Sequence, residues 1–545
     1  MAVEKKVVAL SRIGGPLNIS DSLRRVIVVA EDGVCWVAQS HKNDPEVQSF
    51  LKQREKSGTV YVTKFVTQSD ITQIYDDNRD HRDSSDEESS QQGRVKQMIR
   101  VAATLGASDI HLVLSNRVVS AIFRIDGVME RQPDFETEEA YGGSLARAAF
   151  NTMTNTGQTG TSWNPTENQD GRIAKRKWLP DAVASIRVAS GPIAGGWEIV
   201  LRLSYQDRKP SSDLASLGYE EKQIWIFRRV SRLPHGLNII CGPTGSGKST
   251  TLARIMTGHH LDSNGQKNTV TVEEPVELPI LGARQHSVAS ATESEEDRRR
   301  AFNDIGRSVL RRDPDIIMFG EVRDFETAAM AFKGAMTGHL VWTTTHANGA
   351  FDIPSRMVEI GVDPSLVYDH SLVPSLTSQT LLRLLCQHCK VPAVTVTRLS
   401  ALFARDATTR PVTADERAAD LVLKRYEGSE IARVLTTCHV DKTFFLGAGC
   451  DHCKQRGTTG RRLVAEVVKT DGRMMNDLRS GKKGTAIARW IREGGRTKKM
   501  IAVARIEEGL HDPFEAESMV GEIAVIMENG VPQPLDQVLR YDYDI

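Results

Sequence analysis

The sequence lacks any run of about 18 apolar residues, so it encodes no recognisable membrane-spanning helix. The apolar stretch that follows the first lysines, "VVAL" at residues 7–10, is too short for the core of a signal peptide. An excess of either charge is also missing, because 70 basic side chains balance 70 acidic ones. A dedicated nucleic-acid binder usually has a basic excess. We therefore expect a cytoplasmic protein that binds no specific nucleic acid.

Cysteine is scarce as well, with seven residues in a chain of 545. This number excludes a disulfide framework, and a cytosolic protein keeps its thiols reduced. The hydrophobic content of 40% and the charged content of 26% are typical of a globular protein. At this length we expect about three or four domains.

The sequence pattern changes several times along the chain. Residues 1–75 alternate short β-like runs with one helical stretch, and residues 76–94 are polar and acidic, as in a flexible linker. Residues 95–222 predict a mixed sheet with helices on one side, whereas the apolar runs within 223–385 predict a parallel sheet covered on both faces. Two cysteine pairs flank a helical insert within 386–460, and the pattern of residues 461–545 is mainly helical.

A phosphate-binding loop is the clearest chemical motif. The segment "GPTGSGKS", residues 242–249, satisfies G-x-x-x-x-G-K-[ST] between an apolar strand and a helix. Its glycines let backbone N–H groups turn toward phosphates, Lys248 is expected to reach the β- and γ-phosphates, and Ser249 to hold Mg²⁺. The cofactors predicted here are ATP and Mg²⁺. The candidate nucleotide-binding residues are Gly242, Pro243, Thr244, Gly245, Ser246, Gly247, Lys248, Ser249 and Thr250.

Carboxylates end two of the later apolar strands. Glu321 follows "DPDIIMF" and suits a Walker B glutamate that orients or deprotonates the attacking water, although a strand can also end in an ordinary glutamate. Glu273, Glu274 and Glu277 cluster after "TVTV", and they are either metal and water ligands or part of a solvated loop. Parallel sheets bind ligands at the C-terminal ends of their strands, which favours the functional interpretation.

Two histidines and four cysteines complete the candidate set. His346 ends the strand in "GHLVWTTTH" and is a candidate sensor of the γ-phosphate, whereas His339, before that strand, is equally compatible with a structural role. Two C-x-x-C pairs, Cys386 with Cys389 and Cys450 with Cys453, predict a closed four-thiolate Zn²⁺ site. Free thiols and a redox pair are weaker alternatives, and His388 and His452 are further possible ligands.

In this order, the motifs resemble those of the secretion ATPases of type II secretion and type IV pilus assembly. The resemblance rests on "GPTGSGKSTTL", "EEPVE", "LRRDPDIIMFGEVRDFETA" and "MTGHLVWTTTHANGA", and upstream on "ASDIHL" and "IRVAS…WEIVLRLS". It covers residues 95–390 densely and the cysteine pairs and C-terminal part more loosely. Two departures stand out: Glu274 replaces the usual aspartate of the acidic box, and the histidine box reads T-T-H-A-N.

The resemblance implies an α/β fold with a RecA-like P-loop ATPase core. A PAS-like domain would precede this core, and a small tetracysteine zinc module and a helical C-terminal part would follow it. It further implies a homo-hexamer, held peripherally at the inner membrane, that hydrolyses ATP to drive an inner-membrane platform protein. In this family arginines of the preceding domain reach the phosphates, which assigns Arg187 and Arg202 by motif match, with Arg172 as a weaker third. Retraction ATPases generally lack both the cysteine module and the extra N-terminal domain, so the chain looks like an assembly or export motor for a type IV pilus, a thin conjugative pilus or a type II secretion pseudopilus.

Two other functions compete with this hypothesis. A nucleic-acid-translocating or plasmid-transfer ATPase uses a RecA-like core too, but the neutral charge and the complete set of motifs argue against it. A scaffold that binds ATP without turnover would need a degenerate Lys248 or Glu321, and both residues are intact.

Overall fold

The computed structural model consists of two compact units, residues 1–93 and 94–545. Apart from a few isolated positions, the described residues are 26–30, 32–56, 61–68, 90–155, 162–205, 210–288, 295–405, 413–526 and 532–533. Most of the predicted linker, residues 76–89, lies outside them, while its last residues belong to a helix, α4 (Ser90–Leu105). No helix among the described residues combines the length and the apolar character needed to cross a membrane.

The first unit contains a small sheet and one well-defined helix. Strand β2 (Val34–Ala38) is central, with β1 (Ile27–Val29) antiparallel on one side and β3 (Val62–Val66) parallel on the other. The parallel pairing needs a crossover, and helix α2 (Pro45–Lys56) lies within it. These elements coincide with the β-like runs and the helical stretch predicted from the sequence.

An antiparallel sheet opens the second unit, in the order β6-β5-β4-β10-β9-β8. Every pairing in it is antiparallel, so the predicted mixed sheet is wrong; successive strands are joined mainly by short turns, which return the chain antiparallel. Helices α4 and α5 (Glu139–Arg147) share one apolar core with the strands. The strands are β4 (Ala107–Ser115), β5 (Val118–Ile125), β6 (Val128–Arg131), β7 (Thr137–Glu138, paired with β5), β8 (Gln169–Ile173), β9 (Val183–Ile193) and β10 (Gly196–Tyr205).

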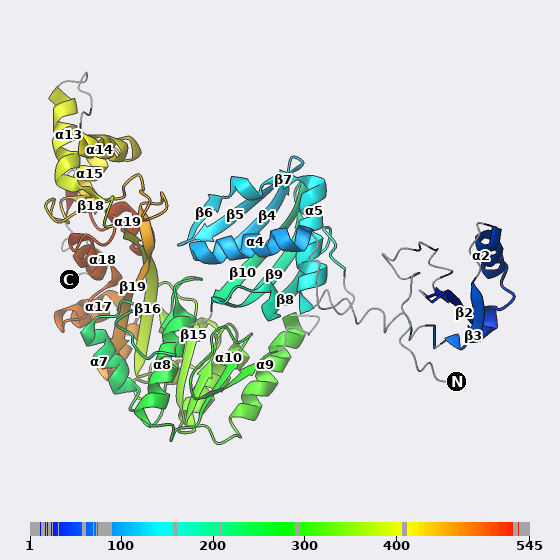
Figure 1. The fold of residues 1–545 in the computed structure, drawn as a ribbon. Helices are drawn as coiled ribbons and strands as arrows, with labels where there is room; N and C mark the ends of the chain where they lie inside the picture. The colour runs from blue at the N-terminus through cyan, green and yellow to red at the C-terminus, as the bar shows by residue number, and fades with distance from the viewer. Residues whose placement is uncertain are drawn as a thin grey trace. The chain divides into compact units, whose positions relative to one another are not determined.

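A second sheet has the order β13-β12-β14-β15-β11-β16-β19, and all its pairings are parallel except β16 with β19. Helices α7 (Glu221–Val230) and α8 (Lys248–Asp262) contribute to the core on one face, and α9 (Glu295–Val309) and α10 (Phe325–Met336) to the core on the other (Figure 1). The parallel sheet covered on both faces is therefore confirmed. Its strands are β11 (Gly236–Cys241), β12 (Thr269–Glu273), β13 (Ala283–Ser287), β14 (Ile316–Phe319), β15 (Leu340–Thr345), β16 (Ser375–Leu385) and β19 (Thr458–Lys469).

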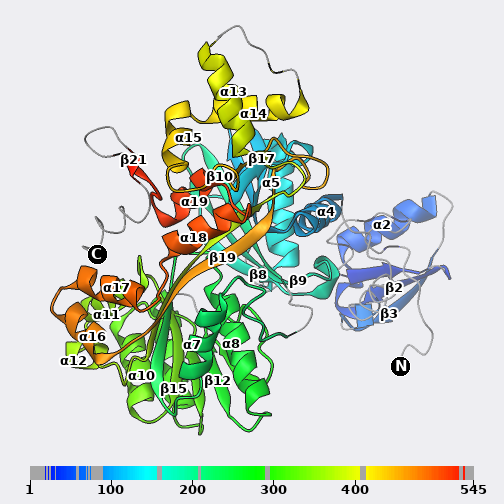
Figure 2. The same cartoon turned by 90° about the vertical axis from the view of Figure 1, so that its left-hand side faces the viewer.

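The region predicted to be mainly helical, residues 461–545, holds four helices between residues 472 and 520, but its first residues, 461–469, belong to strand β19. Strand β19 is an edge strand of the second sheet and pairs along its length with β16, with one register shift between Arg383 and Leu385. Figure 2 shows β19 running up to α18 and α19. Its run "RRLVAEVV" has no clear periodicity, because parts of both its faces are buried between neighbouring helices. Helices follow only after it: α16 (Gly472–Arg479), α17 (Lys483–Arg492), α18 (Lys498–Glu507) and α19 (Pro513–Val520).

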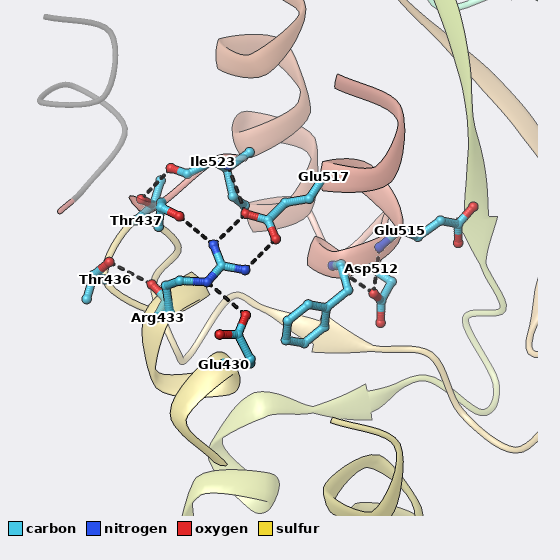
Figure 3. A network of polar contacts seen from close by, with 10 residues as sticks. Glu430, Arg433, Thr436, Thr437, Asp512, Glu515, Glu517 and Ile523 are labelled. Atoms are coloured by element: carbon cyan, nitrogen blue, oxygen red, sulfur yellow. Dashed lines mark hydrogen bonds and ion pairs between the residues drawn. The ribbon is translucent and has the colours of Figure 1, made fainter. Parts of the chain in front are cut away.

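The insert between the cysteine pairs is helical, as predicted, with α13 (Ala393–Arg405), α14 (Ala414–Arg425) and α15 (Gly428–Val434) around a small core of their own. A buried ion pair ties it to the C-terminal helices (Figure 3). The two terminal nitrogens of Arg433 donate to the two carboxylate oxygens of Glu517 at 2.8 and 2.7 Å, and its Nε donates to Glu430. Both side chains of the central pair are about nine-tenths buried, and these hydrogen bonds with Glu517 raise the pKa of Arg433.

We expect the substitution Arg433→Met to destabilise the contact between α15 and α19 by about 3–5 kcal/mol, because it leaves the buried Glu517 carboxylate unpaired. Amide hydrogen exchange in α15 and α19 measures this local stability. Arg356→Met, which removes an exposed pair with Glu359, is the matched control and should change exchange little. Equal protection of α15 and α19 in the two variants would contradict the assigned role of Arg433.

Candidate functional site

The phosphate loop lies between β11 and α8, as the motif requires. Gly242, Gly245 and Gly247 have φ angles of 151°, 76° and 87°, a left-handed range in which a side chain is strained. Helix α8 begins at Lys248, so its N-terminal N–H groups and its dipole face the loop. Pro243, Thr244 and Ser249 are exposed, Thr250 is half-buried and Ser246 is buried beneath the loop. This backbone is therefore shaped to hold phosphates.

Lys248 lies inside the loop that carries it. Its Nζ donates to the carbonyl oxygen of Gly242 at 2.7 Å and contacts that of Pro243 at 3.3 Å. Burial lowers the pKa of Lys248, and the nearby carboxylates of Glu321 and Glu277 partly restore it. The ammonium is thus held at the mouth of the loop with acidic groups within electrostatic reach.

Glu321 and His346 are brought into direct contact. Strands β14 and β15 are parallel neighbours, so the residues that follow them meet at one edge of the sheet. There His346 Nε2 lies 2.6 Å from Glu321 Oε1, while Arg323 binds Glu321 Oε2 at 2.6–2.7 Å. The Glu321 side chain is mostly buried, with 19% exposed. His339 lies at the opposite end of β15, where it contacts the carbonyl of Gly334, and so does not belong to the site.

The three acidic-box residues have different environments. Glu273 ends β12 and is buried, where it accepts hydrogen bonds from Thr271 and Gln285; burial raises its pKa. Glu274 is exposed. Glu277 is also exposed, and its carboxylate pairs with Arg187 of the antiparallel sheet at 3.4 Å. Glu274 and Glu277 are therefore the members of the box that solvent reaches.

The candidate arginines form a row across the antiparallel sheet. Cross-strand register pairs Arg172 with Arg187 and Arg187 with Arg202. Arg202 Nε donates to the buried carboxylate of Asp109 at 2.8 Å, and Arg124 lies 3.7 Å from its other oxygen. Burial lowers the pKa of Arg187; the Glu277 carboxylate partly restores it, and the neighbouring arginines lower it. The row is thus a basic stripe that Asp109 anchors at one end.

The four cysteines of the two pairs converge at the far end of the β16–β19 pair. Their Sγ atoms all lie within 4.8 Å of one another, and three of the separations are 3.8 Å. Burial raises the pKa of Cys453, but the N–H groups of Cys450 and Gly457, together with the neighbouring thiols of Cys450 and Cys389, more than offset this effect and bring it to about 6. His388 and His452 lie outside this cluster and contact each other with tilted rings, at 4.1 Å between ring centroids.

The sequence reasoning missed several residues of the site. Arg323 lies two positions after Glu321 in the quoted Walker B segment, yet nothing in its spacing indicates that it turns back onto Glu321. Asp109 lies within "ASDIHL", but its role depends on strand register, which the sequence does not display. Gln379, on β16, contacts the phosphate loop, and this contact likewise depends on strand register.

Comparison with known proteins places these features in a family. Residues 84–529 match the model of the family described as "Type II/IV secretion system protein". The chain is 31% identical over 399 residues to the type II secretion system protein E of Aeromonas hydrophila, covering 73% of this chain and 69% of that protein. It is also 31% identical over 447 residues to the type IV pilus assembly ATPase PilB of Thermus thermophilus, covering 79% of this chain but 44% of the relative.

A solved structure supports the fold. The ATPase DotB of Legionella pneumophila aligns with a TM-score of 0.50 at 19% sequence identity, covering 78% of this chain and 94% of that one. Such a likeness shows a shared α/β fold alone, whereas the family match extends over most of the sequence. With its complete phosphate loop and the Glu321–His346 contact, the chain is a P-loop ATPase and belongs to the type II/IV secretion system protein family.

Proposed function

We propose that this ATPase powers the assembly of a type IV pilus, a thin conjugative pilus or a type II secretion pseudopilus. The observation that carries the proposal is the Glu321–His346 contact at the phosphate loop, in a chain whose relatives are named for pilus assembly and type II secretion. Glu321 orients and deprotonates the attacking water, and His346 holds its carboxylate and responds to the γ-phosphate. Lys248 binds the β- and γ-phosphates, and Ser249 holds Mg²⁺.

The mechanical output requires a second domain that responds to the nucleotide. The arginine row supports this role, because Arg187 already pairs with Glu277 of the acidic box. We propose that Arg187 and Arg202 bind phosphate oxygens when ATP is present, and that the antiparallel sheet is the PAS-like domain of the family. A homo-hexamer held at the cytoplasmic face of the inner membrane passes this motion to a platform protein. Light scattering of the purified protein with ATP measures the number of subunits, and a strict monomer would contradict the ring.

The cysteine cluster fits zinc. A regular tetrahedron of sulfur atoms at about 2.3 Å from Zn²⁺ has edges of about 3.8 Å. Three Sγ–Sγ separations have this value. The N–H groups directed at Cys453 favour its thiolate form, which is the form that binds a metal. We propose a closed structural Zn²⁺ site made by Cys386, Cys389, Cys450 and Cys453.

The experiment that tests the function uses cells carrying Glu321→Gln in place of the native gene. Surface fibres are counted by electron microscopy, and secreted protein is assayed in the same strain. Loss of fibres identifies a pilus-assembly motor, whereas normal fibres with retained exoprotein identify a secretion motor. Normal fibres together with normal secretion, in a variant that no longer hydrolyses ATP when purified, would contradict the proposal. The nucleic-acid motor is then the remaining candidate, and salt-dependent stimulation of the ATPase by DNA would identify it.

A further inference from the structure

Gln379 is a buried amide on β16 that reaches the phosphate loop. Strand β16 lies parallel to β11, and the register pairs Cys241 with Ser378, so Gln379 stands beside the first residue of the loop. Its side chain is fully buried. The Nε2 group donates to the backbone carbonyl of Ser246 at 2.8 Å, and Oε1 accepts from the hydroxyl of Tyr219 at 2.7 Å. Both ends of the amide therefore have partners, which fixes its orientation.

Tyr219 connects the same amide to helix α8. Its hydroxyl lies 3.2 Å from Oγ1 of Thr251, a buried residue in the first turn of the helix. Burial raises the pKa of Tyr219, so the hydroxyl keeps the proton that it donates to Gln379. The ring packs edge-on against Phe227 with 5.1 Å between centroids, which holds the hydroxyl in place. These contacts form a hydrogen-bonded series from Thr251 through Tyr219 and Gln379 to Ser246. Its two ends lie on either side of Lys248 in the sequence.

The backbone of Gln379 also shapes the start of the loop. A Cβ atom at Gly242 would lie 2.3 Å from the Gln379 carbonyl oxygen, so only glycine fits there. The end of the loop is held by the side chain instead. In a trans peptide unit the C=O and the following N–H point in opposite directions. Because Gln379 holds the carbonyl of Ser246, the N–H of Gly247 must point away from β16. Gly247, with φ of 87°, has no side chain to fix this orientation by itself.

We propose that Gln379, supported by Tyr219, is a positioning residue for nucleotide binding. It holds the Ser246–Gly247 peptide with its N–H directed into the phosphate loop, and so pre-organises one donor to a phosphate oxygen. Pre-organisation matters because a loop that must order on binding loses affinity. This role concerns ATP and ADP binding and is independent of which fibre the motor assembles.

The test compares Gln379→Met with Thr380→Val in the full chain. Methionine has a similar volume and removes both side-chain hydrogen bonds. Thr380 is the next residue on β16 and is buried, and its Oγ1 has no hydrogen-bond partner among the described residues, so valine is a matched control. We expect the Kd for a fluorescent ATP analogue, measured by anisotropy, to rise about tenfold or more in Gln379→Met, since two buried hydrogen bonds are lost. Thr380→Val should bind as the wild type does.

Two further variants separate the bonds. Tyr219→Phe removes only the hydroxyl, and we expect the Kd to rise about two- to fivefold. Gln379→Glu keeps an acceptor for Tyr219 but places a carboxylate oxygen against the Ser246 carbonyl, so its loss of affinity should exceed that of Tyr219→Phe. If Gln379→Met fails to fold, the Kd of Tyr219→Phe still tests whether this hydrogen-bonded pair supports nucleotide binding. An unchanged Kd in Tyr219→Phe and Gln379→Glu, with only a lower unfolding midpoint of the nucleotide-free protein, would show a merely structural role and overturn the proposal.

Discussion

The variant Glu321→Gln is expected to lower kcat for ATP hydrolysis about 10²- to 10⁴-fold, the usual contribution of a general base. Glutamine retains the size of the side chain and an oxygen that can face His346, but it cannot accept a proton from water. Nucleotide affinity should change little, because the phosphate loop and Lys248 are untouched. Phosphate release measures kcat, and anisotropy of a fluorescent ATP analogue measures the Kd.

A matched control comes from another glutamate. Glu359 is exposed and pairs with Arg356 on helix α11 (Ile353–Glu359), so Glu359→Gln should leave both kcat and Kd unchanged. If Glu321→Gln hydrolysed ATP at the native rate, Glu321 would not be the base, and the exposed Glu274 and Glu277 of the acidic box would be the next candidates. If the variant lost nucleotide binding instead, Glu321 would hold the loop or Mg²⁺ rather than activate water.

The contact between Glu321 and His346 shows which features of this site can be predicted from the sequence and which cannot. Each residue was recognised because it ends an apolar strand, and parallel strands place such residues on one edge of a sheet. The phosphate loop was likewise predictable, because its glycines, its lysine and its flanking strand and helix are all local features. What the local pattern does not contain is the order of the strands. That β14 and β15 are neighbours depends on tertiary packing, and only this order brings the two side chains to 2.6 Å.

Residues whose contacts depend on strand register could not be predicted either, because the local sequence does not show which strands pair. Asp109 meets Arg202 because β4 and β10 pair, and Gln379 meets Ser246 because β16 pairs with β11. Neither pairing leaves a trace in local composition. Residues 461–469, at the start of the region predicted to be mainly helical, form a strand for a similar reason, since β19 is stabilised by its long pairing with β16 rather than by its own periodicity. Hydrogen bonding across the sheet overrides local preference here.

Substitution of a cysteine in the four-cysteine cluster is expected to lower both the zinc content and the local stability strongly. Strand β16 ends at Leu385, one residue before Cys386, and β19 begins at Thr458, shortly after Cys453. A metal held by these thiolates would therefore join the ends of the paired strands at the base of the helical insert. We expect Cys389→Ser to reduce bound zinc from about one ion per chain to nearly none. Loss of this crosslink should destabilise the module locally by about 3–5 kcal/mol, comparable to the loss of a native crosslink around a long loop.

Cys438→Ala provides the matched control, because Cys438 is buried in the same part of the chain but lies outside the four-cysteine cluster. Inductively coupled plasma mass spectrometry measures zinc, and amide hydrogen exchange over residues 386–405 and 444–457 measures local stability. The control should keep its zinc and its protection at the cysteines. Full zinc in Cys389→Ser, or none in the wild-type protein, would contradict a four-thiolate site.

Strand β16 also carries Gln379, which contacts the phosphate loop. If the cysteine end of β16 becomes less stable in Cys389→Ser, we expect this contact to weaken as well. Nucleotide affinity should then fall in parallel with the exchange protection of β16.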